Sequence, residues 1–332
     1  MLKVLRGGQL SSVQDAGRMG FQALGVTPGG ALDTVALRVG NWLVGNADHL
    51  AAIEMTWAGL QVSFTEDALI ALTGALAEVS CEALSVPFWR PVWIRRGSVL
   101  QMGQVIEGAR VYLCVQGGIV TPTVMGGQGT DLRNRFGGHA GRALKAGDTL
   151  VVGPQPNRYP RLHAGLQCSP AGFASPPWQV SMWRDSGMPA DRPLRLLAGP
   201  QQSGLGRQGL ESLHSAQFLV LPQSDRQALR LQGVALKARY DRQPSAGVCF
   251  GVLQLPPDGH PILLLGDHQT TGGYPVIGVT ASVERTRLAQ LKPGDSVRFV
   301  PCGQDEAHRL LQERERRLMT IRRELAQRAE CG

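Results

Sequence analysis

Short apolar runs separated by turn-forming residues recur along the chain, and this pattern constrains the fold more than any other feature of the sequence. The clearest runs cover 194–198, 218–221, 248–255 and 262–265, and each is bounded by Gly, Pro, Ser or Asp. The 42 glycines and 21 prolines among the 332 residues provide for many turns. Short strands punctuated in this way are typical of β-sandwiches and β-barrels. The sequence therefore predicts a mainly β protein.

Helices are expected at only three places. Asp33 is placed to cap a helix that ends near Gly45, and a short helix is expected over 283–291. The longest helix is expected over 304–329, where glutamates and arginines alternate with spaced leucines. The helical segments are therefore few, and the last of them stands at the C-terminal end of the sequence.

The leucines of this last helix raise the question of what it packs against. Leu311, Leu318 and Leu325 recur every seven residues, a spacing that also occurs in coiled-coil dimers. Arg314 and Arg328 lie on the same seam, which weakens the case for a coiled coil. We therefore expect this helix to pack on its own domain.

A chain of 332 residues is longer than a single hydrophobic core usually serves, so two domains are expected. The segments 144–149 and 291–296 resemble each other, and each indicates a tight turn that feeds a strand late in its half. Prolines crowd the stretch between the two halves, as in a stiff linker. We expect an N-terminal β-rich domain at 1–153, a proline-rich linker at 154–178, a C-terminal β-barrel domain at 179–303 and a helix at 304–332.

The charge and the cysteines narrow the class of protein. The net charge of +8 comes from scattered arginines, whereas a nucleic-acid-binding protein gathers its charge in a patch, so no nucleic-acid partner is expected. No segment approaches the ~18 apolar residues of a membrane span, and the N-terminus lacks a signal-peptide pattern. None of the six cysteines forms a C-x-x-C pair and the seven histidines are isolated. We therefore expect a cytoplasmic protein with no membrane partner and no metal site.

Residues 204–209 match the G-x-G-x-x-G motif of dinucleotide-binding proteins. The residues that follow are too few for the crossover helix of a βαβ unit, which takes a dozen or more residues with its loops. The sequence also lacks a Walker-type P-loop, a G-x-S-x-G motif and an H-E-x-x-H motif. We therefore expect no recognisable nucleotide loop in this chain.

Four polar stretches remain as candidate sites, and the first lies near the N-terminus. Asp15 and Arg18 are close enough in sequence to pair and brace a turn. Gly29 and Gly30 follow, and glycines permit a backbone to approach another group closely. An ordinary turn with an ion pair is the alternative interpretation.

The second and third stretches also combine charges with turns. The second, 126–147, is rich in glycine and includes Arg142, and exposed backbone N–H groups with a guanidinium suit a carboxylate or phosphate. The third, Asp225 and Arg226 after the run 218–221, can project into a cleft from a strand end. A surface loop and an Asp–Arg turn are the respective structural alternatives.

The fourth stretch, 266–275, gives the sharpest hypothesis, since consecutive side chains that can hydrogen-bond follow an apolar strand. Gln269 can donate and accept at once, which suits an amide ligand, and Asp267 can hold or deprotonate an N–H group. Thr270 and Thr271 add hydroxyl groups, and Tyr274 precedes a proline that stiffens the exit. This loop predicts recognition of an N–C(=O) group, with an elaborate turn as the structural alternative.

Together these stretches resemble the KipA-like family, also called allophanate hydrolase subunit 2. That family shares its domain type with the carboxyltransferase part of urea amidolyase. Within it, the chain is most similar to the group of C subunits of bacterial 5-oxoprolinases. The resemblance runs from about residue 1 to 302 and is carried by segments 13–18, 29–33, 43–46, 71–75, 112–119, 137–144, 224–226 and 267–275.

The resemblance implies two β-barrel-like domains, of which the C-terminal one is cyclophilin-like. It implies that the chain is one subunit of a complex. The other subunits would be a KipI-like B subunit and a LamB/YcsF-like A subunit, and the chain alone would be inactive. The assembly would hydrolyse 5-oxo-L-proline to L-glutamate with ATP. A lactam is a poor electrophile, and converting its oxygen to a phosphate ester would supply a good leaving group. We expect ATP to be bound largely outside this chain. The expected catalytic residues are Asp267, Asp15, Arg18 and Asp225, and the expected substrate-binding residues are Gln269, Thr270, Thr271, Tyr274, Arg226 and Arg142.

The chain departs from the family pattern in three places. Gln227 and Ala228 stand where the family usually has Met-Gly, the run 127–129 is Gly-Gln-Gly where the family has a Ser/Arg/Ser-type run, and Ala246 replaces an acidic residue. These changes bear on substrate contacts and leave the fold untouched.

Two other functions stay open on the sequence. One is a biotin-dependent carboxyltransferase-type subunit that acts on a urea-like acceptor, which also contains an N–C(=O) unit. The chain carries no biotin-carboxylase or biotin-carrier segment of its own, so partners would have to provide them. The other is a KipA-like regulatory protein that antagonises a kinase inhibitor.

Overall fold

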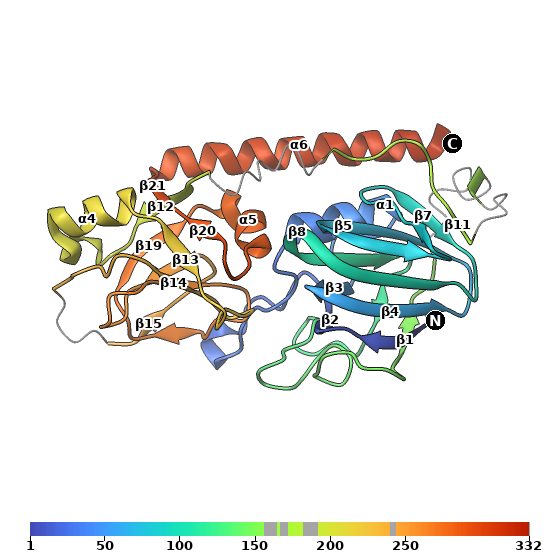
Figure 1. Ribbon diagram of the computed structural model, residues 1–332, viewed down its shortest axis with the longest axis horizontal. Coiled ribbons are helices and arrows are strands. Elements are labelled where there is room, and N and C mark those ends of the chain that lie inside the picture. Colours follow the sequence, from blue (N-terminus) through green and yellow to red (C-terminus); the bar gives the residue numbers. More distant parts are fainter. Residues whose placement is uncertain (156–164, 167–171, 182–191, 240–243, 332) are drawn as a thin grey trace. The chain divides into compact units, whose positions relative to one another are not determined.

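The computed structural model describes residues 1–155, 165–166, 172–181, 192–239 and 244–331. Two compact units form the chain (Figure 1). Unit 1 comprises Met1–Arg18, Asp33–Trp183 and Arg317–Gly332, and unit 2 comprises Met19–Leu32 and Arg184–Arg316. The sequence assigned residues 1–153 to one domain, whereas the structure places residues 19–32 with the second unit. The expected linker at 154–178 lies mostly outside the described residues.

Unit 1 is built on one eleven-stranded sheet. Its two longest strands, β5 (Ala68–Cys81) and β8 (Val99–Val115), pair antiparallel from Ile70↔Val115 to Cys81↔Leu100. Both are rich in the aliphatic residues that favour strands, and their buried side chains contribute to the core of the unit. The other strands are β1 (Leu2–Gly7), β2 (Leu10–Gln14), β3 (Ala52–Thr56), β4 (Ala58–Phe64), β6 (Leu84–Ser85), β7 (Pro91–Ile94), β9 (Ile119–Val120), β10 (Thr149–Val152) and β11 (Phe173–Ala174).

Helix α1 (Thr34–Leu43) packs against this sheet in the position that the sequence predicts. The side chain of Asp33 accepts a hydrogen bond from Ala36 N over 3.0 Å, which satisfies a free N–H group of the first turn. Gly40 permits the close approach, since a Cβ there would lie 2.6 Å from Cys114 Sγ. The predicted cap and the predicted helix are both confirmed.

Unit 2 contains an eight-stranded sheet that closes almost into a barrel. The sheet begins with β20 (Ser296–Val297) and ends with β21 (Phe299–Pro301), and only Arg298 separates these two strands in sequence. The two edges are therefore joined by the chain itself, which leaves little open edge. Between them lie β13 (Phe218–Val220), β14 (Ala228–Gln232), β17 (Ile262–Leu264), β16 (Val252–Gln254), β19 (Val276–Thr280) and β12 (Leu194–Ala198).

Smaller elements complete unit 2. A separate two-stranded antiparallel sheet pairs β15 (Ala246–Gly247) with β18 (Thr271–Gly272). The helices are α4 (Gly206–Ser215), α5 (Arg285–Gln290) and the 3-10 turns η1 (Gln22–Leu24), η2 (Gln202–Leu205) and η3 (Ser282–Glu284). Together η3 and α5 confirm the short helix expected over 283–291.

Residues 19–32 belong to unit 2 for a physical reason. Leu32 is fully buried in the core of unit 2. Arg285 Nε donates to Leu32 O over 3.1 Å, and the same guanidinium lies 4.3 Å from the ring centroid of Phe250. The sequence could not show that residues 19–32 belong to unit 2, because no local pattern indicates which core an apolar residue will join.

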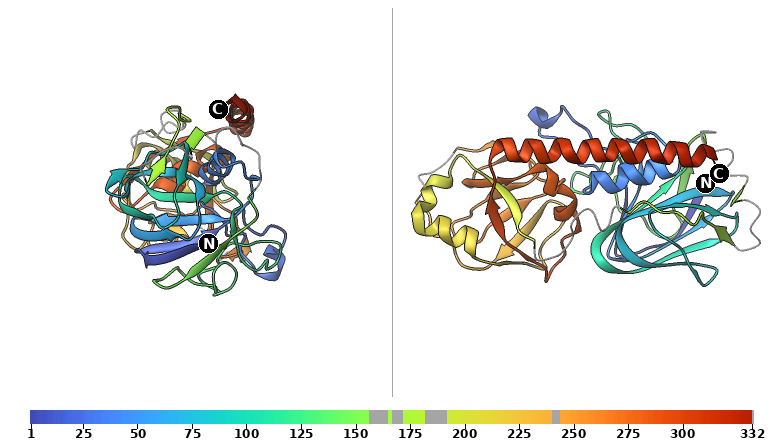
Figure 2. Two further views of the ribbon diagram at one scale, coloured as in Figure 1. Left: turned by 90° about the vertical axis from the view of Figure 1, so that its right-hand side faces the viewer. Right: turned by 90° about the horizontal axis from the view of Figure 1, so that it is seen from above.

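The last helix, α6 (Gln304–Cys331), is one uninterrupted element (Figure 2). Its residues up to 316 belong to unit 2, where Arg314 Nη1 donates to Ser282 O over 3.2 Å. Its later residues belong to unit 1, where Arg322 lies 3.5 Å from Asp48 Oδ1. Leu318 and Leu325 are buried within the single chain. The sequence predicted that this helix packs on its own domain, whereas the structure divides it between unit 2 and unit 1 of the same chain.

The two similar segments of the sequence form similar turns. Lys145 N donates to Asp148 Oδ2 over 2.9 Å, and Lys292 N donates to Asp295 Oδ2 over 3.0 Å. Each turn leads into a strand, β10 or β20.

The prediction of a mainly β chain with a C-terminal helix is confirmed. Among the described residues, no helix is long and apolar enough to cross a membrane.

Candidate functional site

A buried ion pair in unit 2 joins the third and fourth polar stretches. Asp267 follows β17 and Arg226 precedes β14, and these strands are neighbours because Ala228 pairs with Leu264. Arg226 Nε donates to Asp267 Oδ2 over 2.8 Å, and Arg226 Nη2 donates to Asp267 Oδ1 over 3.1 Å. Both residues are 4% exposed. A two-pronged guanidinium–carboxylate pair fixes both side chains, so this corner of the barrel is rigid.

The backbone of residues 27–30 closes the same corner. Arg226 Nη2 also donates to Gly30 O over 2.7 Å, and Thr27 Oγ1 donates to Gly266 O over 3.0 Å. Gly30 has φ +76°, in the region that favours glycine. The sequence-based expectation of a close backbone approach at these glycines is confirmed at Gly30.

The loop beyond Asp267 turns inward before it reaches the surface. His268 is 3% exposed, and its Nδ1 lies 2.6 Å from Gln269 O. Burial lowers the pKa of the His268 imidazole, against the opposing effects of that contact and of the Asp267 carboxylate. The half-buried Thr270 accepts a hydrogen bond at its O atom from Val248 N over 3.1 Å. His268 therefore lies in the interior and shapes the loop.

Gln254 is a further residue of this corner to which no sequence motif pointed. It ends β16, is 1% exposed, and accepts a hydrogen bond at Oε1 from Gln269 Nε2 over 3.4 Å. A Cβ built on Gly272 would lie 2.4 Å from Gln254 Nε2, so this glycine rests against the carboxamide. The available signal was a carboxamide side chain inside the apolar run 248–255.

The outer residues of the loop are open to solvent. Thr271 is exposed and pairs with Gly247 in the two-stranded sheet, and Tyr274 is 47% exposed. Asp225 is also exposed, and its Oδ1 accepts hydrogen bonds from Gln227 N over 2.7 Å and from Ala228 N over 3.1 Å. Asp225 thus stabilises the turn before β14, as its structural alternative required.

In unit 1, Asp15 and Arg18 do not form the ion pair that the sequence suggested. Asp15 Oδ2 accepts a hydrogen bond from Gln128 N over 2.6 Å. Arg18 is 1% exposed, donates through Nη2 to Gly129 O, and lies 4.7 Å from the ring centroid of Phe136. Within the described part of the chain, the glycine-rich loop provides partners for both charged groups, so neither needs the other. Arg18 Nη1 is buried and has no hydrogen-bond partner among the described residues.

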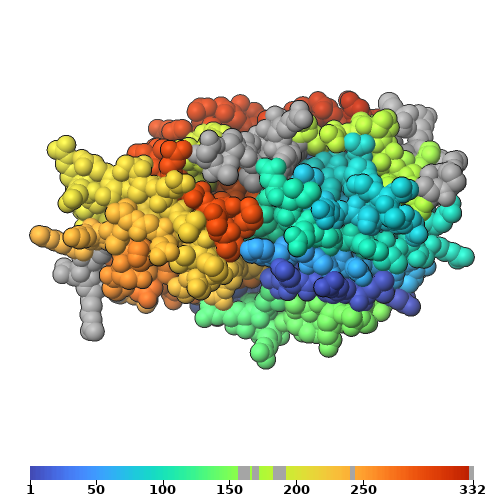
Figure 3. Space-filling model, in the orientation of Figure 1, coloured from blue at the N-terminus to red at the C-terminus, as the bar shows by residue number. Residues whose placement is uncertain are grey.

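The rest of the glycine-rich stretch lies beside β1 and β2 on the surface of unit 1 (Figures 1 and 3). Arg142 binds Asp148 through two hydrogen bonds of 2.8 Å, and His139 Nε2 lies 3.4 Å from the same carboxylate. The hydrogen bonds from Arg142 lower the pKa of the Asp148 carboxyl well below its usual range. An anion could bind the guanidinium of Arg142 only if the hydrogen bonds between Arg142 and Asp148 were broken.

The predicted residues therefore fall into two groups. The structure brings together part of the first stretch, the third and the fourth in unit 2, and part of the first with the second in unit 1. The unit 2 group contains Asp225, Arg226, Asp267, Gln269, Thr270, Thr271 and Tyr274, and the unit 1 group contains Asp15, Arg18 and Arg142.

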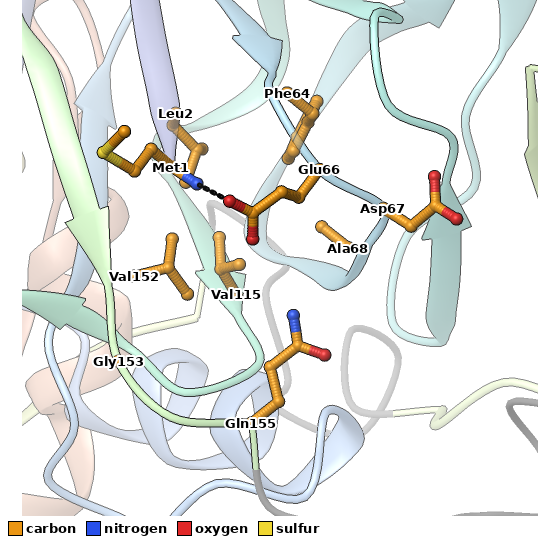
Figure 4. Close-up of a pocket in the computed structure, with 10 residues that line it drawn as sticks. All are labelled: Met1, Leu2, Phe64, Glu66, Asp67, Ala68, Val115, Val152, Gly153 and Gln155. Carbon is orange, nitrogen blue, oxygen red and sulfur yellow. Dashed lines mark ion pairs between the residues drawn. The ribbon is translucent and has the colours of Figure 1, made fainter.

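Two cavities are lined by other residues. A cavity of about 460 Å³ in unit 1 includes Met1, whose ammonium group lies 3.9 Å from Glu66 Oε1 (Figure 4). A cavity of about 660 Å³ in unit 2 borders residues 204–209, where η2 ends and α4 begins, and includes Lys237 and Arg239. Within the described ranges, no group of three or more His, Cys, Asp or Glu side chains could hold a metal ion.

Comparison with known proteins gives full-length relatives. The family described as carboxyltransferase domain, subdomain A and B, matches residues 24–301. The chain is 36% identical over 318 residues to the 5-oxoprolinase C subunit of Escherichia coli (strain K12), covering 95% of this chain and 96% of that protein. It is 33% identical over 325 residues to the protein of the same name from Haemophilus influenzae, covering 97% and 98%.

A solved structure extends the likeness to a larger protein. The urea amidolyase of K. lactis matches 96% of this chain with a TM-score of 0.84 and 27% sequence identity. The chain corresponds to only 20% of that protein. The likeness therefore concerns one region of a larger enzyme.

Proposed function

Because the chain belongs to the carboxyltransferase domain family of subdomains A and B, we propose that it is the C subunit of an ATP-dependent 5-oxoprolinase. In this role it works in a cytoplasmic complex that hydrolyses the ring amide of 5-oxo-L-proline to give L-glutamate. The observation that carries the proposal is the 36% identity to the 5-oxoprolinase C subunit of E. coli, which extends over 95% of this chain and 96% of that protein.

The polar corner of unit 2 suits an amide substrate chemically. A lactam presents a C=O acceptor and an adjacent N–H donor, and a carboxamide such as Gln269 can answer both. Thr271 and Tyr274 add hydroxyl groups at the exposed end of the loop, and Thr270 lies half-buried between them and Gln269. We assign these four residues to substrate binding.

Asp267 and Arg226 act in this proposal by positioning the loop. Both carboxylate oxygens of Asp267 accept hydrogen bonds from the guanidinium of Arg226, and the pair is buried. A carboxylate bound in this way is a weak proton acceptor. Asp267 therefore holds the loop in place and does not take the proton of the lactam nitrogen.

The unit 1 residues form a second part of the proposal. The buried Nη1 of Arg18 lacks a partner among the described residues, so the guanidinium retains a donor for an anionic group. Asp15 fixes the glycine-rich loop beside it through Gln128 N. Arg142 is bound by Asp148 and can contact substrate only after those bonds are broken, whereas the exposed Asp225 holds a turn through Oδ1.

We place the ATP site on the two partners, a KipI-like B subunit together with a LamB/YcsF-like A subunit. The residues of this chain do not fit a dinucleotide fold at residues 204–209, where η2 ends and α4 begins, because β12 and β13 on either side of α4 are not neighbours in the sheet. The parallel βαβ unit that such a fold requires is therefore not formed there.

Reconstitution tests this assignment. The purified chain is mixed with its KipI-like and LamB/YcsF-like partners, and glutamate release from 5-oxoproline is measured with and without ATP. We expect no release from the isolated chain, ATP-dependent release from the full assembly, and loss of release when any one protein is omitted. A full assembly that releases no glutamate would exclude the proposal.

A second candidate function is carboxyl transfer to a urea-like acceptor. The observation in its favour is the match to K. lactis urea amidolyase at a TM-score of 0.84. Urea also contains an N–C(=O) unit, so the same loop could receive it. Co-purification separates the two: KipI-like and LamB/YcsF-like partners indicate 5-oxoproline hydrolysis, whereas a biotin carboxylase indicates carboxyl transfer.

A further inference from the structure

Gln254 occupies an interior position in a way that folding does not explain. Its side chain is 1% exposed, and its Nε2 has no hydrogen-bond partner among the described residues. A buried polar group without a partner lowers stability, and most buried polar groups in proteins do have partners. A methionine of similar length would fill the same space without this cost. The glutamine therefore calls for a reason other than the fold.

The surroundings of Gln254 fix which atom faces outward. Its Oε1 accepts from Gln269 Nε2, so the amide is oriented with Nε2 against Gly272, where an added Cβ would approach to 2.4 Å. The residues on either side of this glycine, Thr271 and Gly273, are exposed. The two-stranded sheet that contains it has two residues in each strand. One glycine of a minimal surface sheet thus covers a buried donor.

We propose that Gln254 determines the specificity of this site for amides, and this inference rests on the proposed function. When strand β18 moves at Gly272, Nε2 donates to the carbonyl oxygen of the substrate. Oε1 of Gln269 lies on the adjacent carboxamide and accepts from the substrate N–H. Two oriented carboxamides recognise a small N–C(=O) compound by its C=O acceptor and its N–H donor. They discriminate against an analogue such as proline, whose ring lacks the carbonyl group.

The first test replaces the donor. In the reconstituted enzyme, Gln254→Met should raise the KM for 5-oxoproline by roughly ten-fold, because the substrate loses one hydrogen bond in a buried site. The melting temperature of the chain should stay the same or rise, because an unpartnered polar group is removed. Gln201→Met is the matched control: Gln201 Oε1 accepts from Val276 N over 2.9 Å, so this variant should melt earlier with an unchanged KM.

The second test uses the glycine that covers the donor. Gly272→Ala places a methyl group against Nε2, and the flexible end of Gln254 can swing aside, so the chain should fold normally with a raised KM. If the effect acts through Gln254, the double variant Gly272→Ala/Gln254→Met should have the KM of Gln254→Met alone. Independent, multiplying effects on KM would overturn the shared mechanism.

The outcomes separate this inference from the function on which it rests. A wild-type assembly that does not hydrolyse 5-oxoproline and does not act on urea contradicts both. An active wild-type assembly combined with a normal KM in Gln254→Met contradicts only the role of Gln254. A lower melting temperature in Gln254→Met with unchanged kinetics would show that the glutamine serves the fold.

Discussion

A single carboxylate, Asp267, links the fold of unit 2 to its polar loop. From the sequence alone, Asp267→Asn is a change of equal size that should leave folding intact. The structure indicates otherwise, because Arg226 would remain 4% exposed without its carboxylate partner. Breaking a buried ion pair typically costs about 3–5 kcal/mol. We expect Asp267→Asn to lower the free energy of unfolding by about that amount in urea titrations, and an unchanged transition midpoint would contradict a structural role.

Thr271 offers the contrasting case on the same loop. Its side chain is exposed, so Thr271→Val should change the free energy of unfolding by less than about 0.5 kcal/mol. If its hydroxyl binds the substrate, the same variant should lower kcat/KM of the assembled enzyme by roughly ten-fold. Thr270 and Thr271 cannot be distinguished by residue type, and only their burial identifies Thr271 as the one that a ligand can reach. Normal kinetics would remove Thr271 from the site.

The Arg142–Asp148 pair predicts a pH dependence. Arg142 lowers the pKa of the Asp148 carboxyl in the folded chain below its usual value of about 3.9. The folded state therefore binds fewer protons there, so the pair stabilises the protein above about pH 4 and this stabilisation is lost as the pH falls further. Asp148→Asn should lower the melting temperature at pH 7 and flatten its decline below about pH 4. The exposed Asp258 provides the control, since Asp258→Asn should keep the wild-type profile in calorimetry.

At the scale of elements, helix α6 shows what a leucine repeat can mean. Leu318 is 1% exposed within one chain, although its seven-residue spacing also suits a dimer. Leu318→Ala should lower the free energy of unfolding by about 2–5 kcal/mol, the usual cost of removing a buried leucine side chain. Replacement of the exposed Arg323 on the same helix should be nearly neutral. A mass measurement decides the alternative: if Leu318→Ala dissociates a dimer while the monomer stays stable, the repeat serves association.

Elements were predictable where the signal is local. The cap at Asp33, the helix that follows it and the strand 194–198 appear at their expected positions, because capping and apolar runs depend on near neighbours. The polar loop after β17 was also visible as a run of hydrogen-bonding residues. Neither the ion pair between Asp267 and Arg226 nor the contact of Gln254 with Gly272 was predictable. Both depend on which strands become neighbours in the barrel. Pairing between strands that are far apart in sequence is not indicated by any local sequence pattern.

The division of the chain was the least predictable feature. Residues 19–32 lie between two segments of unit 1 in the sequence but belong to unit 2, where Leu32 is part of the core. A domain boundary predicted from the accumulation of prolines cannot show that residues 19–32 join the other unit. These residues join unit 2 because they contact residues that are far away in the sequence. Arg226 Nη2 donates to Gly30 O across 196 positions of sequence. The first polar stretch consequently contributes to both units.

For the molecule as a whole, the remaining question is where ATP binds. The chain offers a G-x-G-x-x-G motif and a cavity with Lys237 and Arg239, yet β12 and β13 are not sheet neighbours, so the motif lacks the framework of a dinucleotide fold. We expect the isolated chain to show no saturable ATP binding in calorimetry, whereas the assembled enzyme binds ATP. Lys237→Gln should leave the KM for ATP of the assembly unchanged. If instead the isolated chain binds ATP and Lys237→Gln abolishes that binding, the nucleotide belongs to this cavity, and this chain supplies the energy-coupling step as well as the amide-binding loop.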